Sequence, residues 1–490
     1  MAELLAAGEA FKDALAWICL RGAAVLFAAL ALWRVGRVVL PPYDWMAQID
    51  GLPTTPVMST ARERWTCIAD KLVMIDNESG LLGTCDEGFG TVNYAEGKHF
   101  DVYTVSVRPT NIKFNWNPNS AANDAINLRR DYATPYDVSG GEYTLSHNFP
   151  VCYVTNVTPV VKAKFSVVPD AVSSLELDAV LNGTLISDLG SAAVSFTSGE
   201  SGYADFAMSG AVASSVGLNA SNSYTWRVRA INGVTLASPK SVASTGPHKT
   251  YVILGEPVEP WSNTPNEHNN AWSTALDLAC MWSGGCETWQ SVATRITHSI
   301  YESGKFTYDT QKGEPRYTSS QGWLFVDRIV FLGAAIDRLK GGIGRGAKVN
   351  CSDCASMVCS FANLLGCELY ASRMEPSGLF DSWFATNPYC AIGCSDWVPP
   401  IWGWSFAFHE VAWSGNCGDS DLVFDACLSV DGDASPGVSP YTKTLPAALV
   451  FCDGDPGAPI AYKEMLTPNS PDGYQKCDSA QSEKARRLLR

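Results

Sequence analysis

Short alternating runs dominate the sequence between about residues 92 and 254. Runs such as DVYTVSV and KAKFSVV place apolar residues at every second position, which is the period of a strand with one buried face. Gly, Asn, Ser and Asp separate the runs and favour turns between them. Because a sheet with one apolar face has to bury it against a second layer, we predict an all-β sandwich of antiparallel strands here.

After about residue 265 the period of the apolar residues changes to three and four positions, as in ETWQSVATRITHSIYES. This spacing indicates amphipathic helices. Strand-like runs return further on, in WGWSFAFHEVAW and DLVFDACLSV. The C-terminal half is therefore predicted to be a mixed α+β domain, and a chain of 490 residues is long enough for two or three domains.

The composition is that of a folded, acidic protein, with 46% hydrophobic residues and a net charge of −15. A nucleic-acid-binding protein needs a basic face, and the sequence has no basic patch with interleaved aromatic residues. We therefore expect no nucleic-acid partner. The one basic run, EKARRLLR at residues 483–490, is explained as well by a solvated helix end as by a binding partner.

Residues 14–33 form an apolar stretch with a single charge, at Arg21. A stretch of this length is enough to cross a bilayer, although an arginine near the middle costs about 2.5–3.5 kcal/mol. A cleavable signal peptide fits poorly because acidic residues precede the stretch. We expect a membrane-associated chain with one N-terminal anchor helix. The alternatives are an amphipathic helix lying on a membrane or a partner, and a buried helix.

Four of the sixteen cysteines lie close together in VNCSDCASMVCSFANLLGC, residues 349–367. Apolar residues recur there at helical spacing, so we predict a helix over about residues 352–365, ended by Gly366. Cys351 then stands at the N-terminal end of this helix. The partial positive charge at that end favours a thiolate, and the unpaired N–H groups can face a developing oxyanion.

A cysteine nucleophile needs a base and a group that orients the base. His409 lies in an alternating aromatic run, and Asp425 follows sixteen residues later in the next strand-like run. The connecting segment SGNCGDSD suits a hairpin, so neighbouring strands would carry His409 and Asp425 side by side. Cys351, His409 and Asp425 are therefore our candidate catalytic residues.

These residues resemble the transglutaminase-like superfamily, a branch of the papain-like cysteine fold. In that family a Cys-x-Asp-aromatic-Ala motif opens a helix that ends at a glycine, and later strands carry a histidine and then an aspartate. The motif is similar to Cys351-Ser352-Asp353-Cys354-Ala355, with a cysteine in the aromatic position. Gly366, His409 and Asp425 follow in the family's order and spacing. The resemblance covers about residues 256–463 and implies a Cys-His-Asp triad acting on amides.

The neighbouring cysteines leave other interpretations open. DCASMVCSFANLLG also resembles the Asp-Cys start of the NlpC-type cell-wall peptidases, in which Cys354 would be the nucleophile. Cys351 and Cys354 could instead begin a four-thiolate zinc site with Cys390 and Cys394, although a pair that runs into a helix is atypical of one. Disulfides and free thiols are equally compatible with the sequence. The remaining cysteines of the stretch are interpreted as buried packing residues, Cys359 and Cys367.

Residues 218–233, LNASNSYTWRVRAING, resemble the late-strand region of fibronectin type III and related Ig-like domains. In those domains a tyrosine corner ties a strand to the loop before it, and Tyr224 follows Leu218 by six residues in the corresponding pattern. The resemblance implies an Ig-like sandwich that serves as a spacer or platform.

Together these patterns predict a multidomain chain: an N-terminal hydrophobic helix, an all-β Ig-like sandwich region, and an α+β transglutaminase-like (papain-like) domain. We expect a cysteine protease, amidase or transglutaminase that acts on a protein or peptide substrate without a metal or other cofactor, and the oligomeric state stays open. The alternative is a catalytically silent fold that serves as a membrane-associated binding or assembly protein. Gln321 and Trp323 are candidate oxyanion donors. The expected parts are a hydrophobic helix at 1–45, a β-rich region at 46–160, the sandwich at 161–255, the cysteine domain at 256–468 and a polar, basic tail at 469–490.

Overall fold

The computed structural model describes residues 63–68, 71–76, 90–93, 99–114, 125–135, 142–143, 149–168, 170–262, 270–320, 327–376, 383–398, 405–452, 460–468, 477–479 and 484–490. The expected anchor helix at residues 14–33 and the candidate oxyanion donors Gln321 and Trp323 lie outside the described residues. Within these ranges no helix combines the length and the apolar character that crossing a bilayer requires.

The strands before residue 255 are β1 (Glu63–Ile68), β2 (Lys71–Asp76), β3 (Gly90–Asn93), β4 (His99–Thr104), β5 (Ser106–Lys113), β6 (Leu128–Arg129), β7 (Glu142–Tyr143), β8 (Val151–Val154), β9 (Val160–Val168), β10 (Ser174–Asn182), β11 (Leu189–Thr197), β12 (Glu200–Ser201), β13 (Ala204–Ala207), β14 (Gly217–Ile231) and β15 (Val234–Ile253). The later strands are β16 (Ala271–Trp272), β17 (Thr307–Tyr308), β18 (Thr318–Ser320), β19 (Asp327–Val330), β20 (Lys348–Val349), β21 (Tyr370–Pro376), β22 (Phe384–Ala385), β23 (Tyr389–Ala391), β24 (Ser405–Phe406), β25 (His409–Trp413), β26 (Leu422–Phe424), β27 (Leu428–Asp431), β28 (Lys443–Thr444), β29 (Ala447–Val450), β30 (Cys477–Ser479) and β31 (Leu488–Leu489). The helices are α2 (Ser273–Trp282), α3 (Trp289–Tyr301), α4 (Leu332–Leu339), α5 (Cys351–Leu364) and α6 (Tyr462–Leu466).

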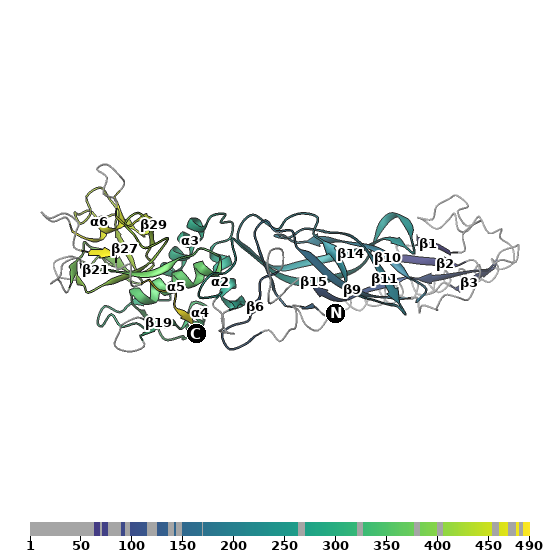
Figure 1. Ribbon diagram of the computed structural model, residues 1–490, viewed down its shortest axis with the longest axis horizontal. Helices are drawn as coiled ribbons and strands as arrows, with labels where there is room; N and C mark the ends of the chain where they lie inside the picture. Colours follow the sequence, from purple (N-terminus) through teal and green to yellow (C-terminus); the bar gives the residue numbers. More distant parts are fainter. Residues whose placement is uncertain are drawn as a thin grey trace, which may run out of the picture.

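The protein consists mostly of strands, and its helices gather toward one end of an elongated molecule (Figure 1). Two hydrophobic cores follow this division. One core lies among the strands from β5 to β15, and the other surrounds α5 in the later half of the chain. The two parts are in contact between β15 and α2, where the Tyr251 hydroxyl donates to the Ser273 carbonyl at 3.1 Å.

The alternating runs form strands as predicted. In β9 every second residue is buried, from Val161 to Val167. Ten of the strands before residue 255 join in one sheet in the order β7-β5-β9-β12-β11-β10-β14-β15-β8, with β13 paired to β9. Strands β1 to β4 form a separate sheet in the order β1-β2-β4-β3, and β6 pairs with β16. The ring of Trp226 on β14 nevertheless lies edge-on to that of Phe165 on β9, with centroids 4.9 Å apart. Strands far apart in the sheet order therefore face each other across one core, so the sheet curls over itself.

The tyrosine-corner prediction for Tyr224 is wrong. Tyr224 and Leu218 lie in the same continuous strand, β14, so no loop immediately precedes the tyrosine. Its hydroxyl donates to the carbonyl of Ser187 at 3.0 Å, a residue far earlier in the chain. The side chain thus joins two distant segments, and the Ig-like assignment of residues 161–255 stays a prediction.

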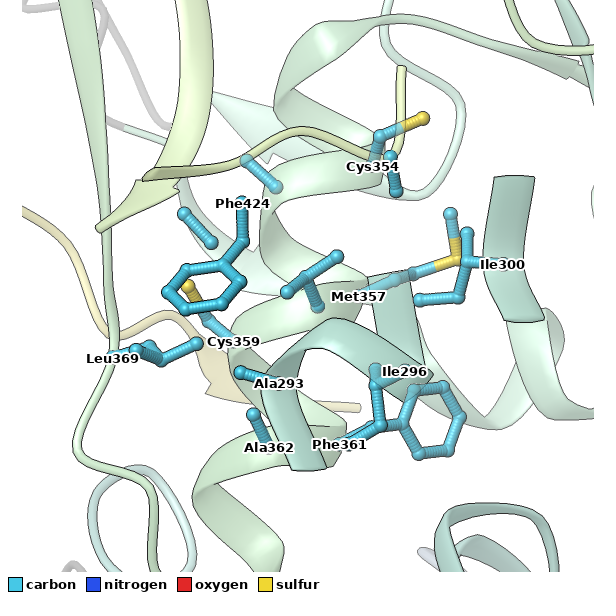
Figure 2. Close-up of a cluster of buried hydrophobic side chains, with 14 of the residues drawn as sticks. Ala293, Ile296, Ile300, Cys354, Met357, Cys359, Phe361, Ala362, Leu369 and Phe424 are labelled. Atoms are coloured by element: carbon cyan, nitrogen blue, oxygen red, sulfur yellow. The ribbon is translucent and has the colours of Figure 1, made fainter. Parts of the chain in front are cut away.

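The second core is built around α5. The predicted helix over residues 352–365 is confirmed to within one residue, but all 14 residues of α5 are buried rather than one apolar stripe. Helices α2, α3 and α4 and the sheet β29-β26-β25-β21-β30 pack around it. Figure 2 shows part of this packing, where α3 contributes Ala293, Ile296 and Ile300 and α5 contributes Met357, Phe361 and Ala362.

Gly366 follows the C-terminal end of α5, as the sequence predicts. Its φ of +89° lies in the left-handed region that glycine tolerates best. A Cβ atom at this position would also come within 2.8 Å of the backbone of Gly255. The glycine therefore permits both the reversal of the chain after the helix and the close passage of the segment that follows β15.

The prediction of a solvated helix end for the basic run at residues 483–490 is wrong. Of its described residues, Leu488 and Leu489 form β31, which pairs in parallel with β19. The Arg487 side chain is only 3% exposed and its guanidinium lies 2.7 Å from the Glu410 carboxylate. Glu410 is distant from Arg487 in the sequence, so no local pattern indicates that the two side chains pair. The sequence alone therefore predicts a solvent-exposed run.

Candidate active site

His409 and Asp425 meet at the end of two neighbouring strands. β25 begins at His409 and pairs in antiparallel fashion with β26, which ends one residue before Asp425. The His409 Nε2 atom lies 2.9 Å from Asp425 Oδ2. Both side chains are almost fully buried, with 0% and 1% exposure, so this pair is shielded from water.

Asp425 is held from several sides. Its Oδ1 atom accepts hydrogen bonds from the backbone N–H groups of Cys427 at 2.7 Å and Leu428 at 3.2 Å. Its Oδ2 atom accepts a third hydrogen bond, at 2.7 Å, from the hydroxyl of Tyr462 on α6. Sequence reasoning missed Tyr462, because nothing in the pattern around α6 links it to a residue 37 positions earlier.

Cys351 is the first residue of α5 and interacts with the ring of His409. The thiol-bearing residue is buried, with 4% exposure. Since Asp425 occupies Nε2, the nitrogen left to exchange a proton with the thiol is Nδ1, which is buried without a hydrogen-bond partner among the described residues. The fold thus brings together the three residues that the sequence places far apart.

The charge state of His409 follows from these neighbours. Burial alone would lower the pKa of the imidazole, because a charged ring is poorly solvated in the interior. Asp425 opposes this effect through its negative charge and hydrogen bond, and Cys351 adds to it, so the pKa of His409 is raised to about 10. The arrangement therefore favours a protonated, positively charged His409 ring.

The start of α5 is fixed by a reciprocal cap. The Asn350 side chain accepts a hydrogen bond from the Asp353 N–H at 3.0 Å, and the Asp353 carboxylate accepts one from the Asn350 N–H at 3.2 Å. Asp353 also accepts hydrogen bonds from the N–H groups of Arg316, Tyr317 and Thr318, each at 2.8 Å. Burial raises its pKa to about 6, against the effect of these hydrogen bonds. The Asp of the Cys-x-Asp motif is thus an anchor between the helix and residues 316–318.

Cys354 has a different environment from Cys351. A hydrogen bond with Cys427 favours its thiolate, but burial and the nearby carboxylates of Asp353 and Asp425 outweigh this bond and leave its pKa raised. Cys354 is fully enclosed in the apolar core and belongs to the same cluster as the α3–α5 packing (Figure 2). These surroundings suit a protonated thiol better than a nucleophile.

The other cysteines of the opening stretch are packing residues in the structure. Burial raises the pKa of both the Cys359 and the Cys367 thiol. Cys390 donates to the Cys394 carbonyl at 3.1 Å instead of sharing a cluster with Cys351. In the part of the chain that the structure describes, no three His, Cys, Asp or Glu side chains are placed to bind one metal ion. The twelve cysteines between Cys152 and Cys452 whose side chains are described are free thiols.

One aromatic ring closes over the candidate base. The ring of Phe406, on β24, lies 5.2 Å from that of His409, tilted by 31°. An apolar cover of this kind keeps water away from the His409–Asp425 hydrogen bond and makes the interaction between the two charges stronger.

No protein-family model matches the chain, and no curated protein matches it. Among solved structures, the chain is similar to the crystal structure of red sea bream transglutaminase, with 12% identity and a TM-score of 0.29. The match covers 62% of this chain and 52% of that one, so it spans about half of the length of the fish enzyme. A TM-score of this size does not establish a shared fold, and the transglutaminase-like assignment stays a prediction.

Proposed function

We propose that this chain is a cysteine-dependent acyl-transfer enzyme, in which Cys351 is the nucleophile, His409 carries the proton and Asp425 orients His409. The observation that carries the proposal is the buried hydrogen bond between His409 Nε2 and Asp425 Oδ2 at 2.9 Å, on a ring that also interacts with Cys351. Covalent acyl transfer needs a nucleophile, a base that accepts its proton and a group that orients the base.

The chemistry follows from these positions. The Cys351 thiolate attacks the carbonyl carbon of a carboxamide or peptide bond, and the C–N bond breaks as the His409 imidazolium gives its proton to the departing amine. A thioester remains on Cys351. Water or a second amine then attacks the thioester and loses a proton to neutral His409. The C–S bond breaks, an acid or a new amide leaves, and the thiolate–imidazolium pair is restored.

The helix N-terminus supports the same reaction. The cap uses the N–H of Asp353, and the N–H of Cys354 donates to the Asn350 carbonyl at 3.2 Å. The N–H groups of Cys351 and Ser352 precede Cys354, whose N–H is the first to donate to a carbonyl of the helix, so they have no acceptor within it. We propose the Cys351 N–H as one donor to the oxyanion that forms on the substrate carbonyl.

The activity is tested with two probes of amide chemistry. Purified protein is incubated with casein, and casein cleavage and the incorporation of fluorescent cadaverine are followed separately. Cleavage assigns water as the acceptor, and incorporation assigns an amine. Cys351→Ala is expected to lower either rate by at least about 10³-fold, because it removes the nucleophile.

Cys354→Ala is the matched control, since it deletes a thiol one helical turn away from Cys351. We expect it to keep activity. Activity that survives in Cys351→Ala and is lost in Cys354→Ala would transfer the nucleophile to Cys354. If the wild-type protein processes neither probe and Cys351 is no more reactive than the other thiols, the catalytically silent binding or assembly protein is the better account.

A further inference from the structure

A second link joins the two elements that carry the candidate nucleophile and base. Ser352, the residue after Cys351, donates its hydroxyl proton to Glu410, the residue after His409, at 2.6 Å. Both side chains are buried, with Ser352 and Glu410 each 1% exposed. The start of α5 and the start of β25 thus interact twice. One interaction joins Cys351 and His409, and the other joins Ser352 and Glu410, which take no part in the proposed chemistry.

Two arginines lie beside the Glu410 carboxylate at this depth. The guanidinium of Arg487 lies 2.7 Å from Glu410 Oε1, and that of Arg373 lies 3.9 Å from Oε2. Arg487 comes from the end of the described chain and Arg373 from β21, the strand beside β25. A carboxylate with a hydrogen-bond donor and two cationic partners has little freedom to rotate, so its contact with Ser352 is a fixed one.

The network also returns to α5. Arg487 donates through Nη1 to the Ser356 hydroxyl at 2.8 Å, and Ser356 donates to the Ser352 carbonyl at 2.6 Å. Buried hydrogen bonds therefore connect the first turn of α5 with the start of β25 and with the segment before β31.

We propose that Ser352 and Glu410, held by Arg487, are positioning residues that set the distance between the Cys351 thiol and the His409 ring. This inference rests on the proposed function for its role, and on the hydrogen bonds and ion pairs around Glu410 for its geometry. A covalent step depends on such alignment, since a displacement of about 1 Å can cost 10²-fold in rate.

Ser352→Ala is the variant that isolates the link, because it removes one hydroxyl and leaves Glu410 paired with both arginines. Ser360→Ala is the matched control, as Ser360 is a buried serine of the same helix without a contact to Glu410. Ser352→Thr keeps the hydroxyl and serves as the rescue. If Ser352→Ala does not fold, Ser352→Cys, similar in size and a weak donor, takes its place.

The first measurement is the rate of Cys351 alkylation by iodoacetamide at neutral pH, followed by mass spectrometry alongside the melting temperature. We expect Ser352→Ala to slow alkylation by about tenfold, Ser352→Thr to restore most of it, and Ser360→Ala to leave it unchanged. Equal rates in Ser352→Ala and Ser360→Ala would overturn the inference.

A second measurement separates this inference from the proposed function. In protein with ¹⁵N-labelled histidine, the ring signal of His409, assigned with His409→Gln, reports the position of the ring whether or not the chain is an enzyme. We expect Ser352→Ala to shift this signal and Ser360→Ala to leave it in place. If wild-type Cys351 is unreactive, the proposed function fails, and the ring signal alone then decides the positioning role: an unshifted signal in Ser352→Ala rejects it.

Discussion

His409 depends on one hydroxyl that lies outside its own strand. The Tyr462 hydroxyl donates a hydrogen bond of 2.7 Å to Asp425 Oδ2, the same oxygen that is hydrogen-bonded to His409 Nε2. The Tyr462 hydroxyl therefore helps to hold the Asp425 carboxylate, which in turn orients the His409 ring. An equivalent contact exists away from the site, because the Tyr251 hydroxyl donates to Asp277 at 2.7 Å.

Tyr462→Phe tests the role of this hydroxyl. We expect kcat to fall by about tenfold with little change in KM, since one hydrogen bond of about 1 kcal/mol to the orienting carboxylate is lost. Tyr251→Phe removes the same chemical group from another tyrosine–aspartate pair and should lower stability by a similar amount without affecting kcat. An equal loss of kcat in both variants would reduce Tyr462 to a structural role.

The raised pKa of His409 predicts a pH dependence. Because the folded-state pKa of about 10 exceeds the ordinary value of 6.5, the protonated ring stabilises the fold fully below about pH 6.5, and this contribution is lost as the pH rises through 10. In the proposed reaction the ring also gives its proton to the departing amine, so turnover should fall along the same alkaline limb. Asp425→Asn should move the limb to lower pH, because the charge that raises the pKa is removed. A wild-type limb near pH 6.5 would contradict the arrangement.

Among the elements, α5 and its capping segment do most to place the proposed nucleophile, Cys351. The Asn350–Asp353 cap fixes where the helix begins, and Asp353 joins that start to residues 316–318 through three backbone N–H groups. The segment from β18 onward leads toward Gln321 and Trp323, the candidate oxyanion donors outside the described residues. Asp353 is thus the connection between the helix and the segment that precedes them.

Asp353→Ala should lower the free energy of unfolding by about 2–4 kcal/mol, because several buried N–H groups lose their acceptor at once. Denaturant unfolding measures this change. Asp337→Ala is the control: Asp337 accepts one hydrogen bond, from the exposed Gly344 N–H at 2.9 Å, and its loss should cost less than about 1 kcal/mol. A similar small cost for Asp353→Ala would contradict the anchoring role.

Local patterns predict the elements of the site and miss what supports them. Helical spacing and Gly366 locate α5, and alternation locates the strands that carry His409 and precede Asp425. The complete burial of α5 is not predictable in this way, because it depends on which elements surround the helix. Tyr462 and Glu410 are missed for the same reason, since each acts through a partner distant in the sequence.

For the whole molecule, the segment at residues 484–490 is an integral part of the second core. Arg487 neutralises Glu410, and the Arg490 N–H donates to the Val330 carbonyl at 2.8 Å. The many charges of this segment predict a solvent-exposed run. In the structure, β31 adds a strand beside β19, and Arg487 forms an ion pair with the buried Glu410. The division between the β-rich part and the α5-centred part, by contrast, is visible in the sequence as a change of period.

Arg487→Met should destabilise the protein by about 3–5 kcal/mol, since it leaves Glu410 with one distant cation in the interior. Arg486→Met is the neighbouring control. The Arg486 guanidinium is half-buried over the Tyr370 ring, 3.9 Å from its centroid, and we expect a loss of about 1 kcal/mol. Thermal unfolding compares the two, and equal losses would show that residues 484–490 contribute surface packing only.

The account is tested most directly by the reactivity of Cys351. Wild-type protein and His409→Gln are treated with limiting iodoacetamide at neutral pH, and the labelled cysteines are resolved by mass spectrometry over time. We predict that Cys351 is alkylated faster than Cys354, Cys359 and Cys367, and that His409→Gln abolishes this advantage, because the imidazolium that stabilises the thiolate is gone. Equal reactivity of Cys351 and its neighbours in the wild-type protein would contradict the assignment of Cys351 as an activated nucleophile.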